Sequence, residues 1–199
     1  AKMTYECNDI GLDTIEAGAA LGLAMEAGLI EFGDVEGALA LLDQVREGTV
    51  LGRVLGNGAE TTGRVLGLER IPIARGQAFP AYDPRALKGN GVTYATSAMG
   101  ADHTAGNAIG SRKMVDPLGR EEQAELSRNL QRVAAMLDMT GFCLFARPPV
   151  VADPQLMVDL INGRYGWGWT VEDLEKAEHE LLRAERAFNR RAGFSDIDD

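Results

Sequence analysis

Cysteine, histidine and basic residues are all scarce in this chain. Its 199 residues include two cysteines and two histidines, and 20 Lys and Arg against 30 Asp and Glu give a formal net charge of −10. Two cysteines are too few for a disulfide scaffold at this length, which favours a reducing, cytoplasmic compartment. The acidic balance argues against a nucleic-acid partner, because neutralising phosphates requires a basic face.

Long apolar runs and a signal peptide are also missing. The longest apolar run, Ala17 to Met25, is too short to cross a bilayer. The first residues are polar and include Lys2 and Glu6, unlike a secretory signal. These absences predict a soluble protein with no membrane partner. The chain opens inside a motif and ends shortly after a predicted helix, which favours a fragment of a longer protein.

The spacing of apolar residues predicts an all-α fold. No segment alternates at the period of a strand, whereas several repeat apolar residues at helical spacing. Helices are expected from Asp13 to about Gly28, Gly33 to Gly48, Thr49 onward, Thr61 to Gly67, Arg85 to Met99, Glu121 to Leu137, Asp153 to Ile161, and Thr170 to Gly193. The proline-rich stretch 71–84 cannot be helical throughout, so two helical subdomains are expected, residues 1–70 and 71–199.

Three local features carry further structural predictions. Asp13 and Glu16 have the spacing of a capping box at the start of a helix. The pair Pro148 and Pro149 is expected to break the chain. Phe188 is expected on the buried face of the last helix.

Two polar turns, each centred on a glycine, have almost the same form. Asn8 to Asp13 reads NDIGLD, and Asp138 to Cys143 reads DMTGFC. Asp9 and Asp13 in the first turn and Asp138 in the second lie beside helix ends, where capping is the ordinary role of a carboxylate. The alternative is binding a flat heterocycle whose amino and ring N–H groups are oriented by paired carboxylates. The two turns are therefore candidate halves of one site.

Cys143 and His103 are the candidates for chemistry. An isolated cysteine is usually buried and structural, and two cysteines cannot supply the four thiolates of an iron–sulfur cluster. His103 lies in the segment GADHTAG, where small neighbours leave space around its ring, so it is a candidate general acid or base. Trp167 and Trp169 are assigned to packing or to an interface rather than to stacking on a ligand.

These motifs, in this order, resemble the aldehyde:ferredoxin oxidoreductase family. Its two pterin-binding motifs have the form D-x-x-G-L-(D/C), which Asn8 to Asp13 and Asp138 to Cys143 resemble. The blocks between them that look like the family's middle section are AYDPR at 81–85, KGNG at 88–91, YATS at 94–97 and GADH at 100–103. Residues 144–199 continue the resemblance mainly as helices.

The resemblance implies tungsten, or molybdenum in some members, held between two molybdopterin-type dithiolenes beside a [4Fe–4S] cluster. It also implies oxidation of an aldehyde to a carboxylic acid, with electrons passed to ferredoxin. The resemblance implies that one pterin is contacted by Asn8, Asp9, Leu12 and Asp13, and the other by Asp138 and Phe142. It also implies that Cys143 is a ligand of the cluster and that His103 transfers a proton beside the metal.

The chain also departs from the family pattern. Asn8 replaces the usual aspartate, Phe142 replaces leucine, and Asp102 stands where ferredoxin-linked aldehyde enzymes often have cysteine. The family's N-terminal sheet domain, its C-x-x-C-x-x-x-C run and a catalytic glutamate are missing. The chain is therefore expected to be the C-terminal helical portion, inactive and without cofactors by itself, with the parent's N-terminal domain as a partner; a homodimer stays open. The alternative is a non-catalytic helical binding or scaffold protein that kept the fold and lost the cofactors.

Overall fold

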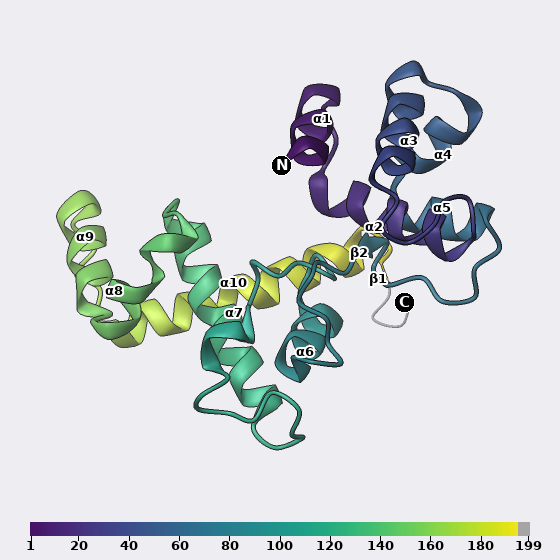
Figure 1. Ribbon diagram of the computed structural model, residues 1–199. Coiled ribbons are helices and arrows are strands. Elements are labelled where there is room, and N and C mark those ends of the chain that lie inside the picture. Colours follow the sequence, from purple (N-terminus) through teal and green to yellow (C-terminus); the bar gives the residue numbers. More distant parts are fainter. Residues whose placement is uncertain (195–199) are drawn as a thin grey trace. The chain divides into compact units, whose positions relative to one another are not determined.

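The computed structural model describes residues 1–194, and its regular secondary structure is helical apart from two short strands (Figure 1). The helices are α1 (Lys2–Ile10), α2 (Thr14–Glu26), α3 (Val35–Glu47), α4 (Val50–Gly56), α5 (Gly58–Val65), α6 (Lys88–Thr96), α7 (Gln123–Thr140), α8 (Arg147–Ala152), α9 (Gln155–Tyr165) and α10 (Val171–Arg191), with short 3₁₀ turns η1 (Ala108–Ser111) and η2 (Leu144–Ala146). Strands β1 (Ile73–Ala74) and β2 (Gln77–Ala78) pair antiparallel, with Ile73 opposite Ala78. The predicted all-α class is confirmed.

The chain forms two compact units. The first contains residues 1–81 and 99–101, and the second contains 82–98 and the residues from Asp102 onward. The expected division into helical subdomains 1–70 and 71–199 stays a prediction. Within residues 1–194, no helix combines the length and the apolar composition that a bilayer-spanning segment requires.

Helix α2 lies at the centre of the first unit. The buried core around it consists of Cys7, Ala17, Ala20, Leu21, Ala24, Ala38, Leu41, Leu42 and Leu55. Helices α3 and α4 approach so closely that a Cβ on Gly52 would lie 1.9 Å from the carbonyl oxygen of Gln44. Only glycine permits that approach, so the small residues of this unit allow short helices to share one core.

The start of α2 differs from the predicted capping box. Asp13 caps the helix as expected, its Oδ1 accepting hydrogen bonds from the N–H groups of Ile15 at 2.9 Å and Glu16 at 2.8 Å. The Glu16 side chain points into the unit instead of back to the cap. Its Oε1 accepts from Ala59 N at 2.8 Å and its Oε2 from Ala78 N at 2.9 Å. Because buried amides need an acceptor, these long-range partners outcompete the local one.

Helix α7 is the central helix of the second unit. Its last two turns join α8, α9 and the start of α10 in a core of Met136, Leu137, Val150, Met157, Val158, Ile161 and Leu174. On another face, α7 meets α6 through polar side chains. Ser127 Oγ lies 2.8 Å from Thr93 Oγ1 and accepts a hydrogen bond from Gln131 Nε2 at 3.0 Å. This buried network sets the contact between the two helices.

Two predictions about helix positions in the second unit were wrong. Helix α6 starts at Lys88 and not at Arg85, because Asp83 Oδ1 accepts from Arg85 N at 2.7 Å and forms a separate turn. Pro148 and Pro149 do not break the chain. They lie in the first turn of α8, where a missing N–H costs no intrahelical hydrogen bond.

The predicted burial of Phe188 was also wrong. This side chain is 63% exposed, whereas Leu174 near the start of α10 is 1% exposed. The second half of α10 contacts the end of α6 through polar groups instead. Arg186 Nη1 donates to Thr96 O at 2.7 Å, and Asn189 Nδ2 donates to Ala98 O at 2.8 Å.

An ion pair with little solvent exposure joins α7 to α10. Arg132 Nε donates to Glu178 Oε2 at 3.1 Å, and the two side chains are 19% and 8% exposed. Burial raises the pKa of Glu178 above its ordinary value, while the charge of Arg132 acts in the opposite direction. A carboxyl group with a raised pKa binds its proton more tightly in the folded state than in the unfolded state. The free energy of unfolding therefore falls as the pH rises from the carboxyl group's ordinary pKa through its folded-state pKa.

We expect Arg132→Met to lower the free energy of unfolding by about 3–5 kcal/mol at about pH 7, because it leaves a buried carboxylate unpaired. This loss of unfolding free energy should shrink as the pH falls toward about 5, because losing Arg132 raises the pKa of Glu178 further and the carboxyl group then takes up its proton. Urea denaturation followed by circular dichroism measures both effects. The control is Arg128→Met, whose pair with Glu125 is 59% and 69% exposed and which should change stability by under about 0.5 kcal/mol. A deficit at Arg132 that did not vary with pH would contradict this account.

Candidate functional site

The first turn links α1 to α2 within the first unit. Helix α1 ends at Gly11, whose φ of 88° is left-handed and whose N–H bonds to Cys7 O at 2.9 Å. Leu12 is half-buried and packs against the core, which holds the turn in place. Asn8 and Asp13 are exposed on either side of it. Among residues 1–194, neither the Asn8 amide nor Oδ2 of Asp13 has a hydrogen-bond partner, so both are open to a ligand.

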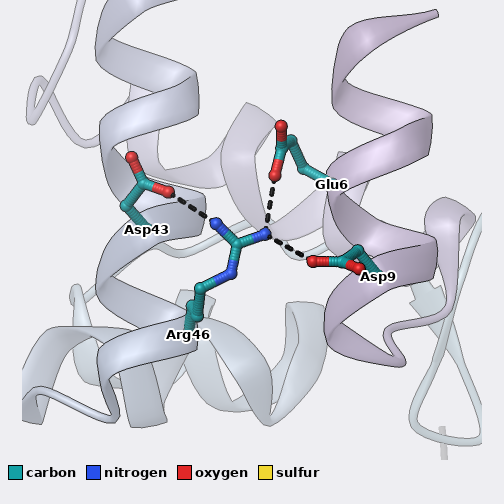
Figure 2. Close-up of polar contacts among 4 residues, drawn as sticks. All are labelled: Glu6, Asp9, Asp43 and Arg46. Carbon is teal, nitrogen blue, oxygen red and sulfur yellow. Dashed lines mark hydrogen bonds and ion pairs between the residues drawn. The ribbon is translucent and has the colours of Figure 1, made fainter.

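Asp9, in the same turn, is already engaged. Figure 2 shows Arg46 of α3 between Glu6 and Asp9 of α1 and Asp43 of its own helix. Its Nη2 lies 2.6 Å from Glu6 Oε2 and 3.1 Å from Asp9 Oδ2, and its Nη1 lies 3.1 Å from Asp43 Oδ1. Hydrogen bonding to Glu6, followed by the nearby carboxylate charges, raises the pKa of Arg46. Sequence reasoning missed Arg46, because nothing in the local pattern pairs it with α1.

The second turn has the same construction at the end of α7. Gly141 adopts a φ of 74° and donates its N–H to Asp138 O at 3.1 Å. Phe142 is 40% exposed, and Cys143 follows as an exposed free thiol at the start of η2. The expectation that an isolated cysteine is buried holds for Cys7, which is 4% exposed, and is wrong for Cys143. The reason is position, since Cys143 follows a surface turn whereas Cys7 faces the first core.

Acidic groups surround the second turn. Desolvation by neighbouring atoms, and then the charge of Asp102, raise the pKa of Asp138. Desolvation, and then the charge of Asp138, raise the pKa of Glu185. These three carboxylates therefore lie within electrostatic reach of one another. In residues 1–194, no three His, Cys, Asp or Glu side chains come together as a metal site, so Cys143 stands without companion ligands there.

His103 is half-buried and its ring stacks on Tyr82, with ring centroids 5.3 Å apart and an interplanar angle of 26°. Tyr82 is held in turn by Tyr94, which is 2% exposed and donates its hydroxyl to Tyr82 O at 3.1 Å. Asp102 accepts from Thr104 N at 2.8 Å and from its Oγ1 at 2.7 Å, which orders the loop around the ring. Sequence reasoning found His103 and missed Tyr82, because the stacking joins two separate segments. His103, Asp138 and Cys143 all belong to the second unit.

Comparison with known proteins identifies the family. The family described as aldehyde ferredoxin oxidoreductase, domains 2 & 3, matches residues 1–199. Tungsten-containing aldehyde ferredoxin oxidoreductases of Thermococcus kodakarensis and Pyrococcus furiosus are each 28% identical over 219 residues, covering 100% of this chain, and that of Pyrococcus abyssi is 29% identical, covering 98%. The chain spans 36% of the length of each relative. It belongs to the aldehyde ferredoxin oxidoreductase family, as the part that corresponds to domains 2 and 3.

Proposed function

We propose that this chain is the helical portion of a tungsten, or molybdenum, pterin oxidoreductase. The whole protein would oxidise an aldehyde to a carboxylic acid and pass electrons through a [4Fe–4S] cluster to ferredoxin or another acceptor in the cytoplasm. Its partners would include the N-terminal domain of the same polypeptide. The observation that carries the proposal is the family match over all 199 residues, with an open polar turn in each unit.

The polar atoms at the two turns fit a pterin. Exposed carboxylate and amide oxygens accept hydrogen bonds from amino and ring N–H groups, which are what a pterin edge presents. The residues that would hold one pterin are Asn8, Asp9, Leu12 and Asp13, and those that would hold the other are Asp138 and Phe142. Asp9 would act through Oδ1, the oxygen that Arg46 does not bind.

Cys143 fits the role of a single ligand to a cluster. Its thiol is free and exposed, and a [4Fe–4S] cluster takes four cysteine thiolates. Because residues 1–194 offer no companion ligands, the other three would come from the rest of the polypeptide, where a C-x-x-C-x-x-x-C run is expected.

His103 would hold or move a proton at the substrate carbonyl. Stacking on Tyr82 restricts the ring to one plane, which would orient it toward a bound substrate. The bound metal would supply the two-electron redox chemistry. Tyr82 would be a positioning residue, since it acts through the His103 ring.

Metal analysis of the full-length protein, purified without oxygen, tests the proposal. We expect tungsten or molybdenum together with iron, because the turns and Cys143 would otherwise have no ligands to hold. Elemental mass spectrometry gives the content of each metal. A protein that contained none of the three would favour the alternative, a helical binding or scaffold protein that kept the fold without the cofactors.

A further inference from the structure

The second unit contains an aromatic pocket that the proposed function does not explain. It has a volume of about 460 Å³ and lies among the end of α7, the last turns of α9 and the loop after α9. Its apolar walls include Met139, Phe142, Leu160, Tyr165, Trp167 and Trp169. Both tryptophans of the chain are therefore in one pocket, whose size is that of a small-molecule site.

The aromatic wall is built by the loop after α9. Tyr165 and Trp167 stack with centroids 4.6 Å apart at 18°, and Trp169 follows 5.0 Å from Trp167 at 40°. Asn162 fixes the loop, since its Nδ2 donates to Trp169 O and its Oδ1 accepts from Trp169 N, both at 2.8 Å. Tyr165 and Trp167 remain 57% and 56% exposed. The protein thus holds a ladder of three rings in place, with parts of Tyr165 and Trp167 exposed.

Arg164 is the one charged residue that lines the pocket. Its guanidinium lies 5.3 Å from the centre of the Tyr165 ring. No carboxylate of residues 1–194 pairs with it, although the chain carries a net charge of −10. A guanidinium at an aromatic wall can bind a carboxylate through two parallel hydrogen bonds while the ligand's ring stacks on indole.

We propose that this pocket binds a planar aromatic carboxylate. Its ring packs against the exposed parts of Tyr165 and Trp167, and its carboxylate pairs with Arg164. An aliphatic acid would lack the contact with the aromatic rings, and a neutral aromatic compound would lack the ion pair with Arg164. The pocket shares Phe142 with the second turn, but Arg164, Trp167 and Trp169 have no part in the pterin and cluster roles proposed above. Its test therefore reads ligand affinity and needs neither metal analysis nor turnover.

The test is calorimetric titration of the full-length protein with 2-naphthoate and with its neutral analogue 2-naphthamide. We expect saturable binding of 2-naphthoate, weakened about tenfold or more by Arg164→Met because a charge-assisted pair is lost. The same variant should bind 2-naphthamide with an affinity within about twofold of that of the unaltered protein. Trp167→Leu should lower the affinity for both ligands by about fivefold, because an aromatic contact is lost. Arg120→Met is the matched control, because Arg120 is exposed and does not line the pocket.

Three results would overturn the proposal. The first is no saturable binding of 2-naphthoate by the unaltered protein, which is also the outcome if another segment of the polypeptide fills the pocket. The second is an equal loss of affinity for 2-naphthoate and for 2-naphthamide in Arg164→Met. The third is binding of cyclohexanecarboxylate as tight as that of 2-naphthoate. Circular dichroism of each variant confirms that a lost affinity is not a lost fold.

Discussion

Replacing Cys143 with serine is expected to remove the [4Fe–4S] cluster, and with it turnover, from the full-length protein. The thiol is exposed and free at the turn that ends α7, where it can reach a ligand from outside residues 1–194. Such clusters are held by four thiolates, and a serine hydroxyl stays protonated at neutral pH. One iron would lose its ligand. Iron analysis and the visible absorption of the anaerobically purified protein measure the loss.

Cys7→Ala is the matched control, because it removes the chain's other thiol. Cys7 is 4% exposed in the core of the first unit, and burial, followed by the charge of Asp13, raises the pKa of its thiol. We expect this variant to keep its iron, with a modest loss of stability from the smaller side chain. Retention of iron in Cys143→Ser together with its loss in Cys7→Ala would show that the ligand was assigned to the wrong cysteine.

The second large effect is expected at His103. His103→Ala should lower kcat by about 10²–10⁴-fold, the usual contribution of a positioned general acid or base. Because no role in holding the metal is proposed for His103, the tungsten or molybdenum content and the iron content should stay as in the unaltered protein. Aldehyde-dependent reduction of an artificial electron acceptor gives the rate, and elemental analysis of the same sample gives the metals.

Two substitutions of Tyr82 separate positioning from general damage. Tyr82→Phe keeps a ring 5.3 Å from His103 and should keep most of the activity. Tyr82→Leu removes the stacking and should lower kcat and alter its pH profile, since the imidazole is no longer held in one plane. If His103→Ala lost metal and activity in parallel, His103 would be structural and the proton-transfer role would fail.

Helix starts were the features best predicted from the sequence. Asp34 Oδ1 accepts from Gly37 N at 2.8 Å, Thr49 Oγ1 accepts from Gly52 N at 3.0 Å, and Thr170 and Asp173 form a reciprocal capping box. The predicted helix starts at Asp34, Thr49 and Thr170 are confirmed because a cap joins residues only three apart, so its partners can be read together; the role of Asp173 was not predicted. The Pro148-Pro149 prediction failed because the effect of proline depends on its place in a helix, which residue identity does not specify.

The sequence by itself determined the all-α class, the family and the capped starts of α2, α3, α4 and α10, because helical periodicity, caps and two six-residue turns are local patterns. Only the tertiary structure decided which polar groups are already engaged. Glu16 bonds to amides 43 and 62 residues away, and Arg46 holds Asp9 from 37 residues away. Packing likewise left Cys143 exposed and Cys7 buried. Such contacts depend on how helices meet, and that follows from the whole core rather than from any one segment.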